Sequence, residues 1–176
     1  MADHPAWAEA EACCNPAVSV LYTLEFLHPA FLQDGATIPL RFVLDVEARM
    51  LGIEAGAQFG GGQMAEFLPL AFEADMPTFG EGQIPECKIR IDNAAGKLTP
   101  YLEEAVKVRA DFKVIYRQYR EDDISEPVDG PTEFLITKVT VSGTVIEGVA
   151  SFTDLVNMKF PGLVYTRKEF TSLSYS

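Results

Sequence analysis

The sequence predicts a mostly β domain, and three observations support this fold class. Apolar side chains recur at every second position through much of the chain, which is the period of a half-buried strand. About seven such segments are separated by turn residues, and only two brief stretches show the period of a helix. We therefore expect an antiparallel β-sandwich or a partly open β-barrel, with one or two short helices and extended terminal arms.

The length and composition predict a single domain with one core, since the chain has 176 residues and is 48% apolar. We expect an N-terminal arm or short helix over residues 1–16, a β domain over 17–153, and a C-terminal arm or closing segment over 154–176. The first residues lack the basic start and apolar centre of a signal peptide. No uncharged apolar run reaches the length of about 18 residues that a membrane span needs. We therefore expect a protein made in the cytoplasm.

The N-terminal segment has a helical pattern, because Trp7, Ala10 and Cys14 share one face before Asn15 and Pro16 end it. From residue 19 the period changes to two. The alternating segments are the expected strands: 20–26, 38–44, 68–74, 87–92, 112–119 and 134–151, and a break expected within the last one brings the number to about seven.

Turn and cap residues mark the boundaries of these elements. The stretch AFLQDGAT after the first strand is expected to be a turn, and Gly143 and Gly148 are expected to break or bend the last strand. Thr99 and Pro100 fit the cap and first residue of a short helix that ends at Val108.

The charge of the chain argues against direct binding to nucleic acid. Fourteen basic and 26 acidic residues give a formal net charge of −12, whereas a nucleic-acid surface needs a basic stripe. The three cysteines, Cys13, Cys14 and Cys87, cannot form a fully paired disulfide framework, and adjacent cysteines rarely bridge. Their spacing also fits no metal-ligand pattern, so we expect reduced thiols and no metal.

Candidates for catalytic or cofactor chemistry are weak, and we predict no catalytic, cofactor-binding or metal-binding residues. The two histidines, His4 and His28, have no paired nucleophile in a recognisable pattern. The run of glycines at 60–62 lacks the Lys-Ser/Thr of a phosphate loop and is expected to be a flexible loop. Six acidic residues between Glu121 and Glu133 are expected to lie in a solvated loop, with a calcium loop as the alternative.

Aromatic residues near both ends are the sequence's main indication of function. Trp7 in the N-terminal arm and Phe160, Tyr165 and Phe170 in the C-terminal segment are candidate interface residues, which a partner would cover. A carbohydrate-binding β-sandwich module is the alternative, because such modules use loop aromatics beside carboxylates. The only tryptophan lies in the N-terminal arm, which disfavours that alternative.

Five segments resemble, in their order and spacing, a family of phage and prophage domains. They span most of residues 20–173 and read LEFLHPA, IPLRFVLD, FLPLAFEADMP, IRIDNAAGKL and FTDLVNMKFPGLVYTRKEFTSL. The family is encoded among the tail-tip genes of long-tailed phages, and its members are often labelled minor tail proteins.

The resemblance implies a structural protein of the virion that forms a ring or collar, of threefold or sixfold symmetry, at the tail tip. Its partners would be copies of itself and other tail-tip proteins, without sequence-specific binding to nucleic acid or insertion into a membrane. An acidic lining would suit a channel through which DNA slides. Some tail-tip proteins hold an iron–sulfur cluster with four cysteines, but three cysteines with this spacing are too few to transfer that cofactor.

Overall fold

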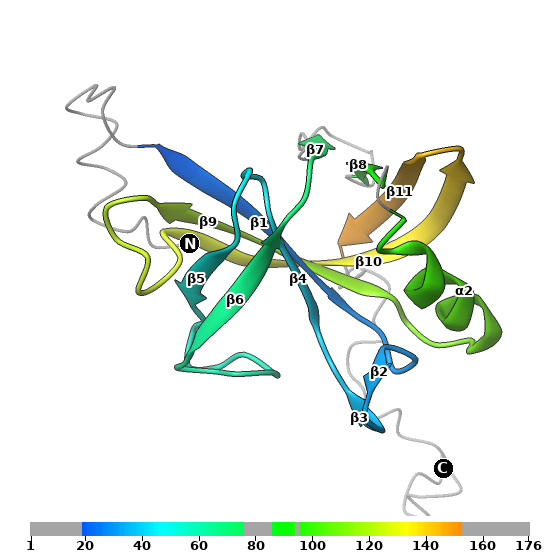
Figure 1. Ribbon diagram of the computed structural model, residues 1–176, viewed down its shortest axis with the longest axis horizontal. Coiled ribbons are helices and arrows are strands. Elements are labelled where there is room, and N and C mark those ends of the chain that lie inside the picture. The colour runs from blue at the N-terminus through cyan, green and yellow to red at the C-terminus, as the bar shows by residue number, and fades with distance from the viewer. Residues whose placement is uncertain (1–18, 76–85, 94–95, 153–176) are drawn as a thin grey trace, which may run out of the picture.

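The computed structural model describes residues 19–75, 86–93 and 96–152, all of which lie inside the predicted β domain (Figure 1). The described elements are β1 (Val20–Leu27), β2 (Leu32–Gln33), β3 (Ala36–Thr37), β4 (Leu40–Val43), β5 (Arg49–Gly52), β6 (Met64–Pro69), β7 (Phe72–Asp75), β8 (Glu86–Asp92), α2 (Thr99–Lys107), β9 (Lys113–Arg120), β10 (Asp129–Ser142) and β11 (Val145–Phe152).

Nine of the strands form one sheet in the order β5-β6-β4-β1-β9-β10-β11-β8-β7. The pairs are antiparallel except for β4 and β6, which run parallel. β1 and β9 lie at the centre of the order and pair along their full eight residues. Strands β2 and β3 form a separate small hairpin.

The sheet folds over on itself, because a two-residue link joins strands that are far apart in its order. β6 lies next to one end of the sheet and β7 at the other, yet only Leu70 and Ala71 separate them in the chain. The amide of Leu70 donates to the carbonyl of Val43, and the amide of Asp92 donates to the carbonyl of Ala71. These bonds bring the two halves of the sheet together without closing a barrel. The prediction of a mostly β, sandwich-like fold is therefore confirmed.

Alternation along the central strands divides their side chains between two faces. On β1, Leu24 and Phe26 belong to the larger apolar cluster, whereas Leu21 belongs to a smaller one on the other face. β9 alternates in the same way, with Val114 and Tyr116 on the first face and Tyr119 on the second. Both faces of these strands are buried, so the interior has two compartments on either side of one sheet.

Helix α2 covers the larger compartment and packs its apolar face against it. Tyr101, Leu102 and Ala105 contact the larger cluster, which also contains the buried Leu98. Its N-cap is Leu98, without a side-chain cap, and the predicted cap Thr99 already lies inside the helix. Asn93 organises this start, because its Oδ1 accepts from the Leu98 amide and its Nδ2 donates to Thr99 Oγ1. The predicted helix is confirmed and the predicted cap is wrong.

Two details of the strands differ from the prediction for physical reasons, and one predicted break is confirmed. The expected strand 68–74 is two strands, because the chain crosses between sheet halves at Leu70 and Ala71. The predicted break at Gly143 is confirmed: the segment 134–151 is a hairpin that turns there, and the φ of 60° at Gly143 suits glycine. Gly148 does not break β11 but pairs with both Val139 and Ile89.

Two short elements were not predicted as strands. β5 carries little alternation, and the stretch expected to be a turn contains the β2–β3 hairpin, which turns at Asp34 and Gly35 with φ values of 52° and 82°. No helix in the described part of the chain is long and apolar enough to cross a membrane.

Candidate functional site

The residues predicted to form interfaces, Trp7, Phe160, Tyr165 and Phe170, lie outside the described residues, as do Cys13 and Cys14. Cys87 lies on β8, is 1% exposed and is a free thiol. Burial raises its pKa to about 11, with a smaller contribution from the charge of Asp75, so the thiol is protonated and poorly nucleophilic at neutral pH.

A cluster of four charged residues, here called the ion network, occupies the smaller compartment. Arg117 on β9 is fully buried and forms a bidentate pair with Glu54, with both N–O distances 2.8 Å. Its Nη1 lies 2.8 Å from Oε2 of Glu25 on β1, which is 2% exposed. Arg41 on β4 donates to the other oxygen of Glu25 at 2.8 Å. Two positive and two negative charges therefore neutralise one another inside the fold.

The ion network attaches the loop after β5 to the sheet. Glu54 lies in this loop and is 22% exposed, and Arg41 also donates to the carbonyl of Phe59 at 2.8 Å. Burial alone would lower the pKa of Arg117, but the hydrogen bonds and negative charges of Glu54 and Glu25 outweigh it and raise that pKa above its ordinary value. Each charge of the network lies within ion-pair distance of an opposite charge, which suits a structural role.

The loop attached in this way contains the glycine run at 60–62, which the structure confirms as a loop. Gly60 and Gly62 have φ values of 70° and 72°, and Gly60 lies beside the Arg41 guanidinium. Strand β6 rather than a helix follows the loop, so these amides do not lie at a helix N-terminus as in a phosphate loop.

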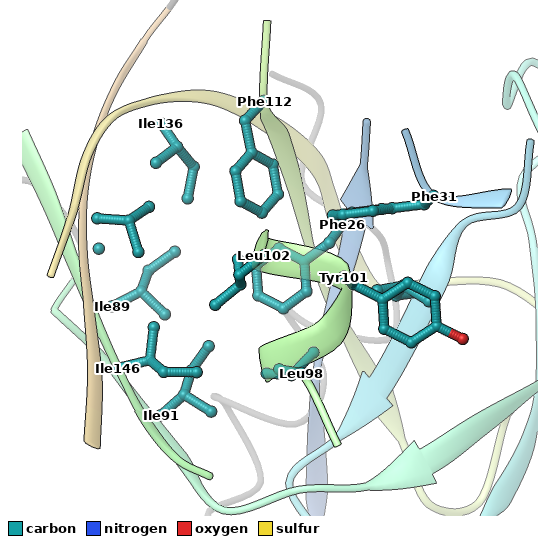
Figure 2. Close-up of a pocket in the computed structure, with 13 residues that line it drawn as sticks. Phe26, Phe31, Ile89, Ile91, Leu98, Tyr101, Leu102, Phe112, Ile136 and Ile146 are labelled. Atoms are coloured by element: carbon teal, nitrogen blue, oxygen red, sulfur yellow. The ribbon is translucent and has the colours of Figure 1, made fainter. Parts of the chain in front are cut away.

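The larger compartment contains a small cavity between α2 and the folded sheet. Figure 2 shows Leu102 of α2 directed toward Phe112 and Ile89, with Tyr101 beside Phe31. The rings of Tyr101 and Phe31 pack edge to face with centroids 5.7 Å apart. The cavity measures about 20 Å³ and only apolar surface lines it. Such a space has no polar partner for a water molecule and is a packing void.

An apolar groove opens at the surface beside this cavity, and we call it the α2–β10 groove. Its volume is about 420 Å³, and Thr99, Glu103 and Ala110 also line it. Val106 is 83% exposed and follows Leu102 by one helical turn, and Val141 on β10 is 54% exposed. The apolar residues that line the groove come from α2 and β10, together with Phe112 just before β9: Leu102, Ala105, Val106, Phe112, Val139 and Val141.

His28, predicted to be a strand-end residue, follows β1 and is 3% exposed. Its Nδ1 accepts from the amide of Ala30, and its ring packs against Phe31 and Phe112. These contacts fix the ring beside the α2–β10 groove, where His28 contributes to the lining.

The acidic stretch 121–133 is not one solvated loop, because β10 begins at Asp129. Asp129 accepts from Gln118, and Glu133 lies 2.8 Å from Lys113 on the neighbouring strand. In the remaining loop, Asp122 pairs with Arg120 and Asp123 accepts from Ser125. Among the described residues, no group of three His, Cys, Asp or Glu side chains is arranged to hold a metal ion.

In a comparison with protein families, residues 10–165 match the family described as Domain of unknown function (DUF1833). The chain belongs to the DUF1833 family. A search of curated proteins finds no match. The matched range contains every described residue of the DUF1833 domain, including both compartments and the α2–β10 groove.

Sequence reasoning missed both main features of the DUF1833 domain, although each left a signal. Glu25, Arg41 and Arg117 are charges of opposite sign inside three expected strands, and Glu25 and Arg41 occupy directly opposed positions. Val106 and Val141 are apolar residues at the edge of their elements, a pattern that could equally come from isolated exposed valines. Only the folded chain brings these residues together.

Proposed function

We propose that this DUF1833 domain is a structural subunit of the tail tip of a long-tailed phage. It is made in the host cytoplasm and enters the virion, where it binds neighbouring tail proteins in a ring or collar. The observation that carries the proposal is the α2–β10 groove, which exposes apolar side chains on a chain of net charge −12. A strongly acidic domain is soluble without such a groove, so a partner that covers it explains its presence.

The surroundings of the groove support a protein partner. Protein interfaces combine an apolar centre with a polar rim. In the groove, most of the lining is apolar and includes the exposed Val106 and Val141, whereas Glu103 and Thr99 are polar. The arrangement suits a side chain or segment of another protein better than a sugar, which needs several polar groups and a stacking ring.

The rigidity of the rest of the domain also supports a structural role. The ion network fixes the loop after β5, and the two-residue link at Leu70 and Ala71 holds the sheet halves together. A ring subunit transmits contacts to its neighbours on both sides, which requires a stiff body between two different binding surfaces. The resemblance of five ordered segments to tail-tip proteins supplies the biological setting.

Native mass spectrometry over a range of protein concentrations tests this proposal. The purified chain is measured alone and after mixing with tail proteins encoded beside it, with an unrelated acidic protein as the control for non-specific adducts. We expect a closed trimer or hexamer, or a defined complex with a tail protein. A monomer that ignores every tail protein, together with binding in a carbohydrate screen, would replace the proposal with the carbohydrate-binding alternative.

A further inference from the structure

The α2–β10 groove is a direct continuation of the protein interior. Leu102, Phe112 and Val139 line both the groove and the small apolar cavity beside it. An apolar side chain that enters the groove would therefore extend the larger compartment of the core outward. Burial of Val106 and Val141 on binding removes apolar surface from water, which is the main driving force for association.

The chain itself contains a segment of matching chemistry, residues 153–176. It is rich in large apolar residues and has three basic and two acidic side chains, whereas residues 1–152 have 11 basic and 24 acidic ones. Glu103, the charged residue in the groove lining, would attract such a segment. Its large apolar residues are Leu155, Val156, Met158, Phe160, Leu163, Val164, Tyr165, Phe170, Leu173 and Tyr175.

The position of the last described strand lets this segment leave its own subunit. β11 ends at Phe152, which pairs with Phe134, whereas the groove residues Val139 and Val141 pair with Gly148 and Ile146 nearer the hairpin. The segment therefore starts at the opposite end of the β10–β11 ribbon from the groove. Its 24 residues can extend for up to about 80 Å, which exceeds the diameter of a small domain.

We propose that residues 153–176 of one copy bind in the α2–β10 groove of the next copy. This inference rests on the proposed ring, and it names the contact that holds the ring together. Each copy offers a donor segment and an acceptor groove on different parts of its surface, which makes the contact heterologous. Heterologous contacts close into a ring when each copy is rotated by the same angle from the last.

Two full-length variants separate donor from acceptor. Val106→Lys introduces a positive charge into the groove at an 83% exposed helix position, so the fold is preserved while the segment is repelled. Phe160→Ser/Tyr165→Ser removes two aromatic side chains from the segment. Val46→Lys is the matched control, because Val46 is a 90% exposed valine that does not line the groove.

Native mass spectrometry of these variants gives a distinctive expected pattern. Val46→Lys assembles like the wild type, whereas Val106→Lys and Phe160→Ser/Tyr165→Ser are each monomeric. An equal mixture of the two defective variants forms a heterodimer and stops there, because only one donor and one acceptor remain competent. Rings that persist in Val106→Lys overturn this inference and leave the proposed ring function intact.

A labelled peptide of residues 153–176 tests the contact independently of ring closure. We expect it to bind the Phe160→Ser/Tyr165→Ser chain, and the additional change Val106→Lys to weaken binding at least tenfold. Adding Val46→Lys instead leaves the affinity unchanged. Equal affinity for both doubly changed chains overturns the inference. If the wild-type chain stays monomeric at all concentrations, the proposal of a ring is overturned, and the proposed contact between copies is overturned with it.

Discussion

The two faces of the central strands both contain buried side chains but are stabilised in different ways. On one face Leu24, Phe26 and Val114 belong to an apolar cluster, part of which lines a cavity without polar surface. On the other, Glu25 and Arg117 are held by ion pairs of fixed geometry. Apolar packing has no direction and can continue outward into a groove, whereas an ion network is complete only with its own partners. The apolar face is therefore suited to binding a partner, and the ion-network face is suited to keeping the domain rigid.

Among the changes that test this comparison, Arg117→Met is expected to lower the free energy of unfolding most. It removes the fully buried partner of the Glu25 carboxylate, which is 2% exposed and keeps only Arg41, and breaking a buried pair costs about 3–5 kcal/mol. Urea unfolding followed by circular dichroism measures the loss. Arg49→Ala is the control: Arg49 also pairs with acidic residues, but it is 37% exposed, so its loss should be much smaller.

A double change tests whether the ion network stabilises the fold or only penalises its own disruption. In Glu25→Leu/Arg117→Met, neither buried charge remains. The two other charged residues, Glu54 and Arg41, are 22% and 15% exposed and so can be solvated. We expect the double variant to recover most of the stability lost in Arg117→Met, since apolar replacement of a whole buried pair is often neutral. A double variant as unstable as the single one would show that the pairs contribute net stability.

Gly52→Ala is the next largest expected effect and acts at the edge of the ion-network face. A Cβ at Gly52 would lie 1.7 Å from the carbonyl oxygen of Ser125, so the loop must move, and the bond from the Gly52 amide to Ile124 is strained or lost. We expect a loss of about 2 kcal/mol in urea unfolding. Gly56→Ala is the control in the same region, because its Cβ meets nothing within 4 Å. Equal stability of the two variants would contradict the close approach.

The apolar face should be the more sensitive of the two to alkaline pH, through Cys87. Burial raises the thiol pKa to about 11, against about 8.5 in an unfolded chain. Above pH 8.5 the unfolded chain releases the Cys87 proton first, so the contribution of this thiol to stability is constant below that pH and falls until about pH 11. Linkage gives a loss of about 2 kcal/mol at pH 10.

Unfolding free energies of the wild type and Cys87→Ala at pH 7, 9 and 10 measure this effect. The variant should lose less stability between pH 7 and 10, whatever its stability at pH 7. Burial also raises the pKa values of Tyr116 and Tyr119, which remain in both proteins and so cancel in the comparison. Parallel pH profiles would mean that Cys87 titrates in the folded chain as it does in the unfolded one.

The apolar face was predictable from sequence to a greater extent than the ion-network face. Alternation identified the strand that contains Leu24 and Phe26, and the helical period identified α2, because local spacing alone determines both. The pairing of Glu25, Glu54 and Arg117 depends on strands and a loop that are 29 to 92 residues apart in the chain, a relation that no local pattern encodes. The groove has the same origin, since Val106 and Val141 meet only when α2 packs beside β10.

The smallest expected effect, a gain, comes from Gly148→Ala in the cavity wall. Gly148 lies in a regular strand, and its Cβ would meet Ile136 Cδ1 at 3.5 Å and the Ile89 carbonyl oxygen at 3.9 Å, both ordinary contacts. The added methyl group fills part of the cavity and restricts the unfolded chain, so stability should rise by about 0.5–1 kcal/mol. Gly143→Ala is the control: its φ of 60° disfavours alanine, and stability should fall although space is open. A loss in Gly148→Ala would mean that the apolar face, like the ion network, has no room to adjust.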